Sequence, residues 1–450
     1  MGMAGTGARV VVRARRIVTA RGERAGRLVI EAGRVAAIDA YDAVGTVTVE
    51  IPDSQVVLVG LVDSHVHVNE PGRTEWEGFA SATAAAAAGG VTTVVDMPLN
   101  SIPPTTTIAG LRAKQAAAAG QLAVDLALWG GAVPGNLAEL PRLHEAGVVG
   151  FKCFLLPSGV PEFGHLDRDG LRAAMAEIAR FDGLLIAHAE DGAVIGAAPP
   201  PTGRSYAGFL ASRPPAAENS AIDWLIEAMT ETGCRTHVVH LSSATALPAI
   251  ATARDQGLPL TVETCPHYLT LAAADVPDGA TMFKCCPPIR DAGNQDDLWQ
   301  GLADGLIDLI VSDHSPSTLD LKHLDTGDFG LAWGGISSVQ LGLPAVWTAA
   351  SRRGFGLADL ARWMSAAPAG LTGLSGKGSL DVGADADFSV LAPEESFVVD
   401  PRRLRHRNPM TPYAGTRLSG VVHQTWLAGR PVELGDRRGR LLRPSPVVAT

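Results

Sequence analysis

The sequence predicts an α/β fold, namely a (β/α)8 TIM barrel with a small β-sandwich domain built from both chain ends. Three observations carry this prediction. Short runs of Val, Ile and Leu recur eight times, helical Ala- and Leu-rich stretches separate them, and alternating strands occur near both ends of the chain. Continuous apolar runs are typical of strands buried on both faces, and intervening helices imply parallel pairing. Eight such strands close most economically into a barrel.

The predicted barrel strands follow one another along the chain. They cover residues 55–66, 90–97, 123–131, 147–155, 183–190, 235–243, 260–268 and 306–313. Apolar and polar residues alternate near the ends instead, as in strands with one solvated face. The candidates there are residues 9–19, 26–38, 47–52, 386–393 and 423–434. We therefore expect residues 55–375 to form the barrel, and residues 1–54 and 376–450 to form the two parts of the β-sandwich domain.

Composition excludes several kinds of partner. The 450 residues carry a formal net charge of −10, whereas binding to nucleic acid or an anionic membrane needs a basic surface. No apolar run reaches the roughly 18 residues of a membrane-spanning helix, and the first twenty residues lack the apolar core of a secretory signal. Five cysteines without CxxC spacing favour reduced thiols. A cytoplasmic protein with neither nucleic-acid nor membrane partners is expected.

Side chains that bind metals stand at the ends of five predicted strands. Active sites of such barrels lie at the carboxyl ends of the strands, so these side chains should converge. His65 and His67 are two residues apart, which puts both imidazoles on one side of the pleat. Imidazoles with a carboxylate suit zinc, and iron, cobalt or manganese are chemically acceptable. The predicted ligands are His65, His67, Lys152, His188, His240 and Asp313.

Other histidines have a simpler interpretation. A lone histidine in a strand is more often a core residue with satisfied hydrogen bonds than a metal ligand. His237 precedes His240 by three residues and therefore has the opposite strand parity, so we choose His240. The core interpretation is kept for His144, His165, His323, His406 and His423.

Lys152 leaves two interpretations open. A free ammonium is repelled by divalent cations and cannot act as a ligand. Reaction with carbon dioxide would give a carbamate whose two oxygens could bridge two metals. The alternative is a lysine that binds the substrate or pairs with an acid outside the site.

The ordered motifs of the chain resemble the amidohydrolase superfamily. Within it, they are similar to the hydrolases of cyclic amides, which include allantoinases, dihydropyrimidinases (hydantoinases) and dihydroorotases, and most of all to the allantoinases. The resemblance covers nearly the whole chain. The motifs are HVHVNEPGRTEWEGF (65–79), DMPLNSIPPTT (96–106), GFKCFLLPSG (150–159), HAED (188–191), ETCPHYLTL (263–271), FKCCPPIRD (283–291), SDHSPS (312–317) and AWGGISSVQLGLP (332–344).

The resemblance implies a binuclear metal centre and a hydrolytic reaction. His65, His67 and Asp313 would hold the more buried metal, His188 and His240 the other, and carboxylated Lys152 would bridge both. A metal-bridging hydroxide would attack the hydantoin ring of allantoin to give allantoate in purine and ureide catabolism, and Asp313 would transfer the proton. Hydantoinase or dihydropyrimidinase activity on other cyclic imides is the alternative. A non-catalytic scaffold is disfavoured because all six ligands are retained. The resemblance also implies a homotetramer.

Departures from the relatives suggest how a cyclic ureide would be bound. Asn69 stands where dihydroorotases carry an Arg for the substrate carboxylate, and this favours a neutral substrate. No Tyr follows Lys152, unlike in dihydropyrimidinases, so Ser158 is a candidate hydrogen-bond donor. His267 is expected to be structural, and His314 should point away from the barrel mouth. The candidate substrate contacts are Asn69, Asn100, Ser158, Cys286, Pro288 and Gly335.

Overall fold

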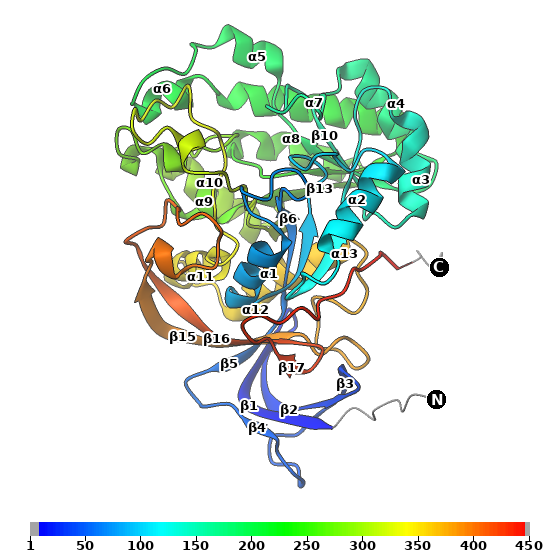
Figure 1. Cartoon of the computed structure of the whole chain (residues 1–450), viewed down its shortest axis with the longest axis vertical. Helices are drawn as coiled ribbons and strands as arrows, with labels where there is room; N and C mark the ends of the chain where they lie inside the picture. Colours follow the sequence, from blue (N-terminus) through cyan, green and yellow to red (C-terminus); the bar gives the residue numbers. More distant parts are fainter. Residues whose placement is uncertain (1–8, 446–450) are drawn as a thin grey trace.

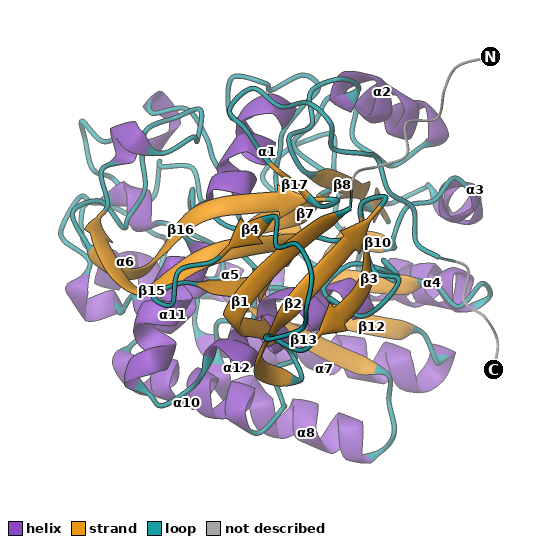
Figure 2. Cartoon of the chain, turned by 90° about the horizontal axis from the view of Figure 1, so that it is seen from below, coloured by secondary structure: helices purple, strands orange, loops and turns teal. Residues whose placement is uncertain are grey.

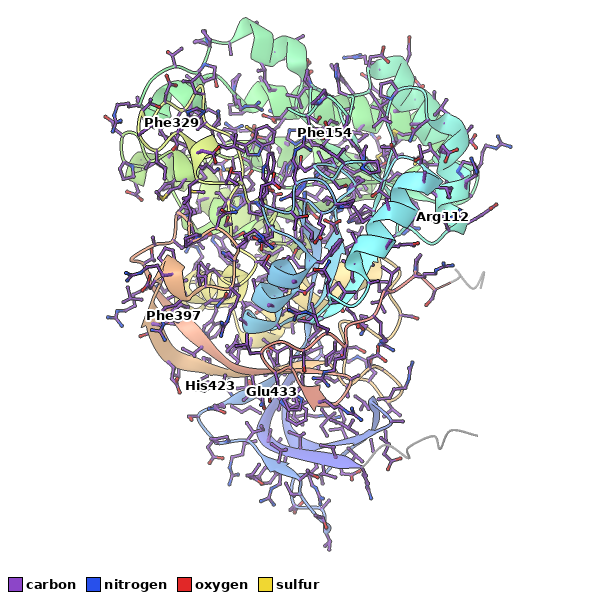
Figure 3. All side chains as sticks on the ribbon, in the orientation of Figure 1. Arg112, Phe154, Phe329, Phe397, His423 and Glu433 are labelled. Atoms are coloured by element: carbon purple, nitrogen blue, oxygen red, sulfur yellow. The ribbon has the colours of Figure 1, made fainter. Side chains whose placement is uncertain are left out.

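The computed structural model describes residues 9–445, whose strands form two regions (Figure 1). Parallel strands surrounded by helices occupy the upper part of Figure 1, and strands from both chain ends lie below them. The fold is thus a (β/α)8 barrel with a β-sandwich domain, as predicted from the sequence. In Figure 3, Phe154 lies in the barrel, whereas Phe397 and His423 lie on the strands from the chain ends.

The terminal strands form one continuous hydrogen-bonded sheet in the order β17-β16-β15-β5-β1-β2-β3, with β4 beside β1. β15, from the C-terminal part of the chain, pairs antiparallel with β5, and β5 pairs parallel with β1. Both chain ends are therefore needed to complete this sheet. Its strands are β1 (Val10–Thr19), β2 (Gly22–Glu31), β3 (Arg34–Asp39), β4 (Val49–Glu50), β5 (Val56–Val59), β15 (Phe388–Val398), β16 (Arg417–Leu427) and β17 (Arg430–Pro431).

The predicted strand 55–66 is in fact two strands. Its first half is β5 of the terminal sheet, and its second half is β6 of the barrel. The chain passes from one sheet to the other at Gly60, where a Cβ atom would clash with the side chain of Thr92. Both halves are fully buried, so their hydrophobicity gave no sign of the break. Strand pairing thus puts β5 with the terminal strands, although we expected the barrel to begin at residue 55.

The barrel contains a strand from each of the eight predicted runs. β6, β7 and β8 form one parallel sheet, and β9 to β14 form another. A bridge between Val66 and His314 closes the ring between the first and eighth strands. The strands are β6 (Leu61–Val66), β7 (Val91–Asp96), β8 (Asp125–Leu128), β9 (Gly130–Gly131), β10 (Phe151–Phe154), β11 (Leu184–His188), β12 (Arg235–Val238), β13 (Leu260–Thr264) and β14 (Leu309–Ile310).

Helices surround the barrel strands, and in the view from below the terminal sheet lies in front of them (Figure 2). In α4, Asp167 caps the N-terminus by accepting from Gly170 N at 2.8 Å, and Leu171, Ala174, Met175 and Ile178 form the buried stripe of an amphipathic helix. The helices are α1 (Phe79–Ala88), α2 (Ile108–Ala118), α3 (Leu140–Glu145), α4 (Arg168–Ala179), α5 (Gly192–Ala197), α6 (Tyr206–Ala211), α7 (Pro215–Thr232), α8 (Leu247–Asp255), α9 (Pro266–Thr270), α10 (Ala292–Ala303), α11 (Gly342–Arg352), α12 (Leu357–Ala361) and α13 (Ala367–Leu371). No helix in residues 9–445 is long and apolar enough to cross a membrane.

A buried ion network, which we call the junction network, joins the barrel to the segments that enter and leave the terminal sheet. The Nζ atom of Lys377 lies 2.6 Å from Asp125, 2.9 Å from Asp385 and 2.6 Å from Asp387. Arg440 adds contacts of 3.0 Å to Asp125 and 2.9 Å to Asp385. The network therefore ties the start of β8 to residues 377–387 and to the C-terminal segment.

Candidate metal centre

The predicted ligands from the first, fourth and eighth barrel strands meet at the barrel mouth. His65 Nε2 lies 3.0 Å from Lys152 Nζ and 3.2 Å from Asp313 Oδ1. His67 Nε2 lies 3.7 Å from the same carboxylate oxygen. One ligand atom each from His65, His67 and Asp313 all lie within 4.8 Å of one another, which is close enough to share one cation.

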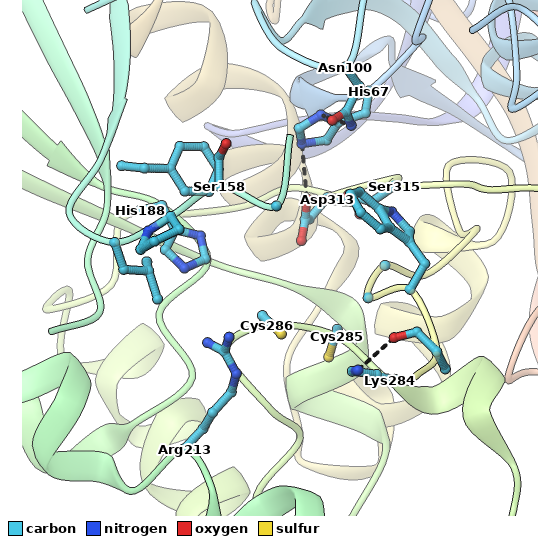
Figure 4. Close-up of a pocket in the computed structure, with 18 of the residues that line it drawn as sticks. His67, Asn100, Ser158, His188, Arg213, Lys284, Cys285, Cys286, Asp313 and Ser315 are labelled. Carbon is cyan, nitrogen blue, oxygen red and sulfur yellow. Dashed lines mark hydrogen bonds and ion pairs between the residues drawn. The ribbon is translucent and has the colours of Figure 1, made fainter. Parts of the chain in front are cut away.

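The other two predicted ligands lie beside this group. The ring centroids of His188 and His240 are 4.6 Å apart, and that of His240 is 5.4 Å from that of His65. Phe154 stacks on His188 with a centroid distance of 4.6 Å and an interplanar angle of 13°, which fixes the plane of that imidazole. Figure 4 shows His67, His188 and Asp313 facing one cavity. The structure thus brings all six predicted side chains together.

The backbone is strained around these residues. His240 and Asp313 have φ angles of 40° and 43°, and Asn69 and Asn100 have φ angles of 66° and 64°. Non-glycine residues rarely adopt this left-handed conformation, which costs of order 1–3 kcal/mol each. All four residues follow the carboxyl ends of barrel strands. Such strain concentrates at functional sites, where the geometry of a side chain matters more than the stability of its backbone.

Glu263 holds the histidines of the centre in place. Its carboxylate accepts from His65 Nδ1 at 2.5 Å, from His237 Nε2 at 3.0 Å and from His240 N at 3.2 Å. Because a carboxylate only accepts, His65 carries its hydrogen on Nδ1 and directs the lone pair of Nε2 toward Lys152 and Asp313. His237 also contacts Thr261 through Nδ1 at 2.8 Å, so both of its nitrogens are used. His237 therefore has no ring nitrogen left for a metal ion.

Glu190 holds the imidazole of His188 in place, as Glu263 does for His65. Its Oε2 accepts from His188 Nε2 at 2.7 Å and forms an ion pair with Arg213. Burial opposes ionisation of Glu190, but Arg213 and His188 outweigh it and lower the pKa of this carboxyl to about 2. His188 therefore keeps Nδ1 for another ligand. Orientation of a metal-binding imidazole by a carboxylate on its other nitrogen is typical of protein metal sites.

The electrostatics of the cluster fit divalent cations. Burial lowers the pKa of His65, His67 and His240 well below the ordinary value, so these imidazoles are neutral, the form that binds metals. Burial also raises the pKa of Asp313 and lowers that of Lys152. His240 Nδ1 is buried and has no hydrogen-bond partner among the described residues. An unpartnered buried nitrogen beside neutral imidazoles suits a metal ligand.

A cavity of about 420 Å³ opens above the cluster, within the usual size range for small-molecule sites. Four of the predicted substrate contacts line it, namely Asn100, Ser158, Cys286 and Gly335. Two of these are engaged by protein groups. Asn100 Nδ2 lies 3.4 Å from His67 Nδ1, and Ser158 Oγ donates to the carbonyl oxygens of Val160 and Phe163.

The structure puts the other two predicted contacts outside the cavity wall. Asn69 is fully buried, and its amide nitrogen lies 3.4 Å from the carbonyl oxygen of Pro316. The carbonyl oxygen of Pro288 accepts from Ser242 Oγ at 2.6 Å. Asn69 lies three residues beyond the end of β6 and Pro288 lies in the loop before α10, and both direct these groups into the protein.

Two histidines near the site are not predicted ligands. His314 lies 3.2 Å from Glu77 through Nε2 and accepts from Ser338 N through Nδ1, so it points away from the mouth as expected. His267 is fully buried and neither of its nitrogens has a partner in residues 9–445. Burial lowers the pKa of His267 to about 3, so its ring is neutral.

Sequence reasoning assigned no role to Glu263, Glu190 or Arg213. Glu263 contacts residues of two distant segments, and Glu190, although only two residues from His188, also pairs with the distant Arg213. A usable signal was nevertheless present for Glu263, because an acidic residue inside a run of buried strand residues needs a partner.

A parallel barrel whose mouth gathers four neutral imidazoles, a lysine and an aspartate defines the class of metal-dependent hydrolases. Residues 56–432 match the amidohydrolase family. The chain belongs to this family, and its residues suit the family's binuclear metal site.

Individual relatives resemble it over almost their whole length. The chain is 56% identical over 443 residues to an allantoinase of Streptomyces avermitilis, covering 97% of this chain and 99% of that protein. It is 46% identical over 391 residues to an allantoinase of Saccharomyces cerevisiae, covering 86% and 84%. The L-hydantoinase (dihydropyrimidinase) from Arthrobacter aurescens superimposes with a TM-score of 0.90 at 31% identity, covering 96% of this chain and 99% of that one.

Proposed function

We propose that this chain hydrolyses the hydantoin ring of allantoin to allantoate, a step of purine and ureide catabolism. The observation that carries the proposal is the end-to-end similarity, at 56% identity, to a protein named allantoinase, in a chain that keeps all six ligand side chains at one place. The second candidate is hydantoinase or dihydropyrimidinase activity on other cyclic imides. The structural similarity to the L-hydantoinase from Arthrobacter aurescens favours it.

We propose that His65, His67 and Asp313 hold one divalent cation and that His188 and His240 hold another. When bound, the two cations supply Lewis acidity and a nucleophilic water at neutral pH. Zinc suits this donor set best, and iron, cobalt or manganese are alternatives.

Lys152 would join the two groups of ligands as a carbamate. Its side chain is buried beside His65, and no carboxylate lies within ion-pair distance among the described residues. Burial lowers the pKa of Lys152, which increases the fraction of neutral amine that can react with carbon dioxide. This supports a modified lysine over one that pairs with an acid.

Asp313 is the residue proposed to move the proton. Burial raises the pKa of its carboxyl toward the range in which a group can both take and return a proton at neutral pH. Ser315 Oγ donates to Asp313 Oδ1 at 2.8 Å and orients the carboxylate. Asp313 would accept a proton from the attacking water and deliver it to the amide nitrogen that leaves the ring.

The test compares allantoin, hydantoin and dihydrouracil as substrates for purified protein grown with ample zinc and bicarbonate. Turnover of allantoin with the highest kcat/KM is expected. Turnover of dihydrouracil without turnover of allantoin would replace the proposal with the second candidate.

The variant Asp313→Asn serves as the mechanistic control in this test. It should lose turnover on every substrate, by on the order of 1,000-fold or more, while keeping its unfolding temperature. Retained activity would remove Asp313 as the proton carrier.

We also propose a cytoplasmic homotetramer without nucleic-acid or membrane partners. The five cysteines are all free thiols in the structure, which supports a reducing compartment. Light scattering of the purified protein tests the assembly.

A further inference from the structure

The chain uses lysine only in its interior. It contains five lysines, and the other 32 of its 37 basic residues are arginines. All five lysines are buried, with exposed fractions of at most 8%. Lysine is normally among the most exposed residues, because burying its ammonium is costly. Arginine therefore supplies the positive charge of the surface, and each buried lysine needs partners for its amine inside the protein.

Three of the five have an evident reason to be there. Lys114 pairs with Asp96 at 2.5 Å, Lys377 pairs with three aspartates, and Lys152 lies in the metal centre. The remaining two, Lys284 and Lys322, have no carboxylate within 4.0 Å among residues 9–445. The reaction proposed above uses neither of them.

Both remaining lysines donate to the same short piece of backbone. Lys322, at the end of the short helix η5 (Asp320–Lys322), donates through Nζ to the carbonyl oxygens of Trp333 at 2.9 Å and Gly335 at 2.5 Å. Lys284 donates through Nζ to the carbonyl oxygen of Ala332 at 2.5 Å, which is the dashed contact beside Lys284 in Figure 4. We call residues 332–335 the wall segment.

Backbone contacts complete the attachment of the wall segment. Gly335 N donates to Lys284 O at 2.8 Å, and Trp333 N donates to Leu321 O at 2.7 Å. Hydrogen bonds therefore hold the wall segment at its first and last residues. Almost all of them come from residues 284, 321 and 322. It has no regular secondary structure of its own, so these bonds replace a helix or strand ladder.

The wall segment faces the cavity along its whole length. The Trp333 ring lies against Gly159, where an added Cβ would come within 3.2 Å of it, and packs on Trp76 at a centroid distance of 5.1 Å. The peptide groups of Gly334 have no backbone partner among the described residues. They offer one donor and one acceptor, which match the –CO–NH– edge of a cyclic ureide.

We propose that Lys322 and Lys284 are positioning residues that hold the wall segment in the shape required to bind the cyclic ureide ring. The inference rests on the proposed function for the identity of the ring. Lys322 contributes more to holding the wall segment than Lys284 does, because it donates to two carbonyl oxygens and Lys284 to one. Burial lowers the pKa of Lys322 to about 7, but a neutral amine keeps two N–H groups, as many as the two carbonyls need. The two hydrogen bonds from Lys322 to the wall segment therefore do not depend on the charge of its amine.

The experiment compares Lys322→Met, Lys284→Met and Lys322→Gln with the unaltered protein. Met fills the space of the lysine stem without a donor, whereas Gln keeps two N–H groups. We expect Lys322→Met to raise KM for allantoin at least 10-fold while kcat changes less than 3-fold and two metal equivalents are retained. Lys284→Met should raise KM less, and Lys322→Gln should recover part of the loss.

Hydrogen exchange gives a second readout that does not need turnover. Amides of residues 330–336 should exchange faster in Lys322→Met, with unchanged exchange in the barrel strands. If the protein does not act on allantoin at all, the proposed function fails, and the exchange data still decide whether the lysines hold the wall segment.

Two results would overturn the inference. One is an unchanged KM and unchanged exchange at residues 330–336 in folded Lys322→Met and Lys284→Met. The other is a parallel fall of kcat, metal content and unfolding temperature, which would make the lysines general structural residues. If Lys322→Met does not fold, Lys284→Met decides by the same criteria, since it removes a single hydrogen bond.

Discussion

The junction network and the metal centre are two buried charged clusters with opposite properties. Both combine lysine with acidic side chains, and one carboxylate oxygen each from Asp125, Asp385 and Asp387 lie as close together as metal ligands would. At the junction, Lys377 and Arg440 occupy those oxygens. At the centre, His240 Nδ1 has no partner among the described residues. Metal-binding side chains alone therefore do not identify a metal site, because the same kind of cluster can be satisfied by protein cations.

The pKa values of the lysines in the two clusters are shifted in opposite directions. Burial opposes the charge of Lys377, but Asp387 and Asp125 outweigh it and raise the pKa of this ammonium. Burial lowers the pKa of Lys152, and more distant acids do not compensate. The junction thus stabilises a fixed charge, whereas the centre keeps its amine available for chemistry. Three experiments test this contrast.

The largest expected effect is the loss of activity in Lys152→Ala. Removing the side chain that joins the two groups of ligands should reduce kcat/KM by on the order of 1,000-fold, equal to about 4 kcal/mol, and lower the metal content below one equivalent. Short carboxylic acids that can bridge the metals should restore part of the activity. Full activity and two metal equivalents in this variant would contradict the assigned role of Lys152.

The next effect is a loss of stability in Lys377→Met. Three buried carboxylates would lose their main partner, which costs about 3–5 kcal/mol in the free energy of unfolding. Urea denaturation measures this loss. Metal content and KM should stay within about 2-fold of the unaltered protein, because the junction lies outside the cavity lining. A fall in metal content at unchanged stability would show that the two clusters are coupled.

The smallest expected effect is the decrease in folding stability at acidic pH that results from protonation of Glu190. Its pKa is about 2 in the folded protein against an ordinary value of 4.5, so its ionised form stabilises the fold. That contribution, roughly 3 kcal/mol, is present above pH 4.5 and disappears as the pH falls toward 2. Urea denaturation of metal-free protein between pH 3 and pH 6 should show this slope, and Glu190→Gln should flatten it. Glu395→Gln, which alters an exposed pair with His423, is the matched control.

Much of the fold was predictable because burial on both faces of a strand is visible in the sequence. The eight apolar runs each contain a barrel strand, and the alternating ends form one sheet. The division between β5 and β6 was not predictable, since both halves of that run are buried in different sheets.

The site was predictable to the extent that it depends on strand ends. Strand parity and position predict that His65, His67 and Asp313 lie together, and both imidazoles lie within 3.7 Å of the Asp313 carboxylate. The supporting residues were not predictable, because Glu263 reaches His65 on β6, His237 on β12 and His240 just beyond β12. The direction of Asn69 was missed for a related reason: its left-handed backbone redirects the side chain, which periodicity cannot express.

The burial of every lysine has a practical consequence for work on this protein in solution. Amine-reactive esters will find no lysine on the surface of the folded chain, so each acylated lysine records a moment when its surroundings opened. Reporters of several separate regions are thus already built into the chain, with Lys284 and Lys322 both at the wall segment. Peptide mass spectrometry after timed acylation would give the opening rate of the wall segment from Lys322 and that of the junction from Lys377, in one sample and without engineered probes.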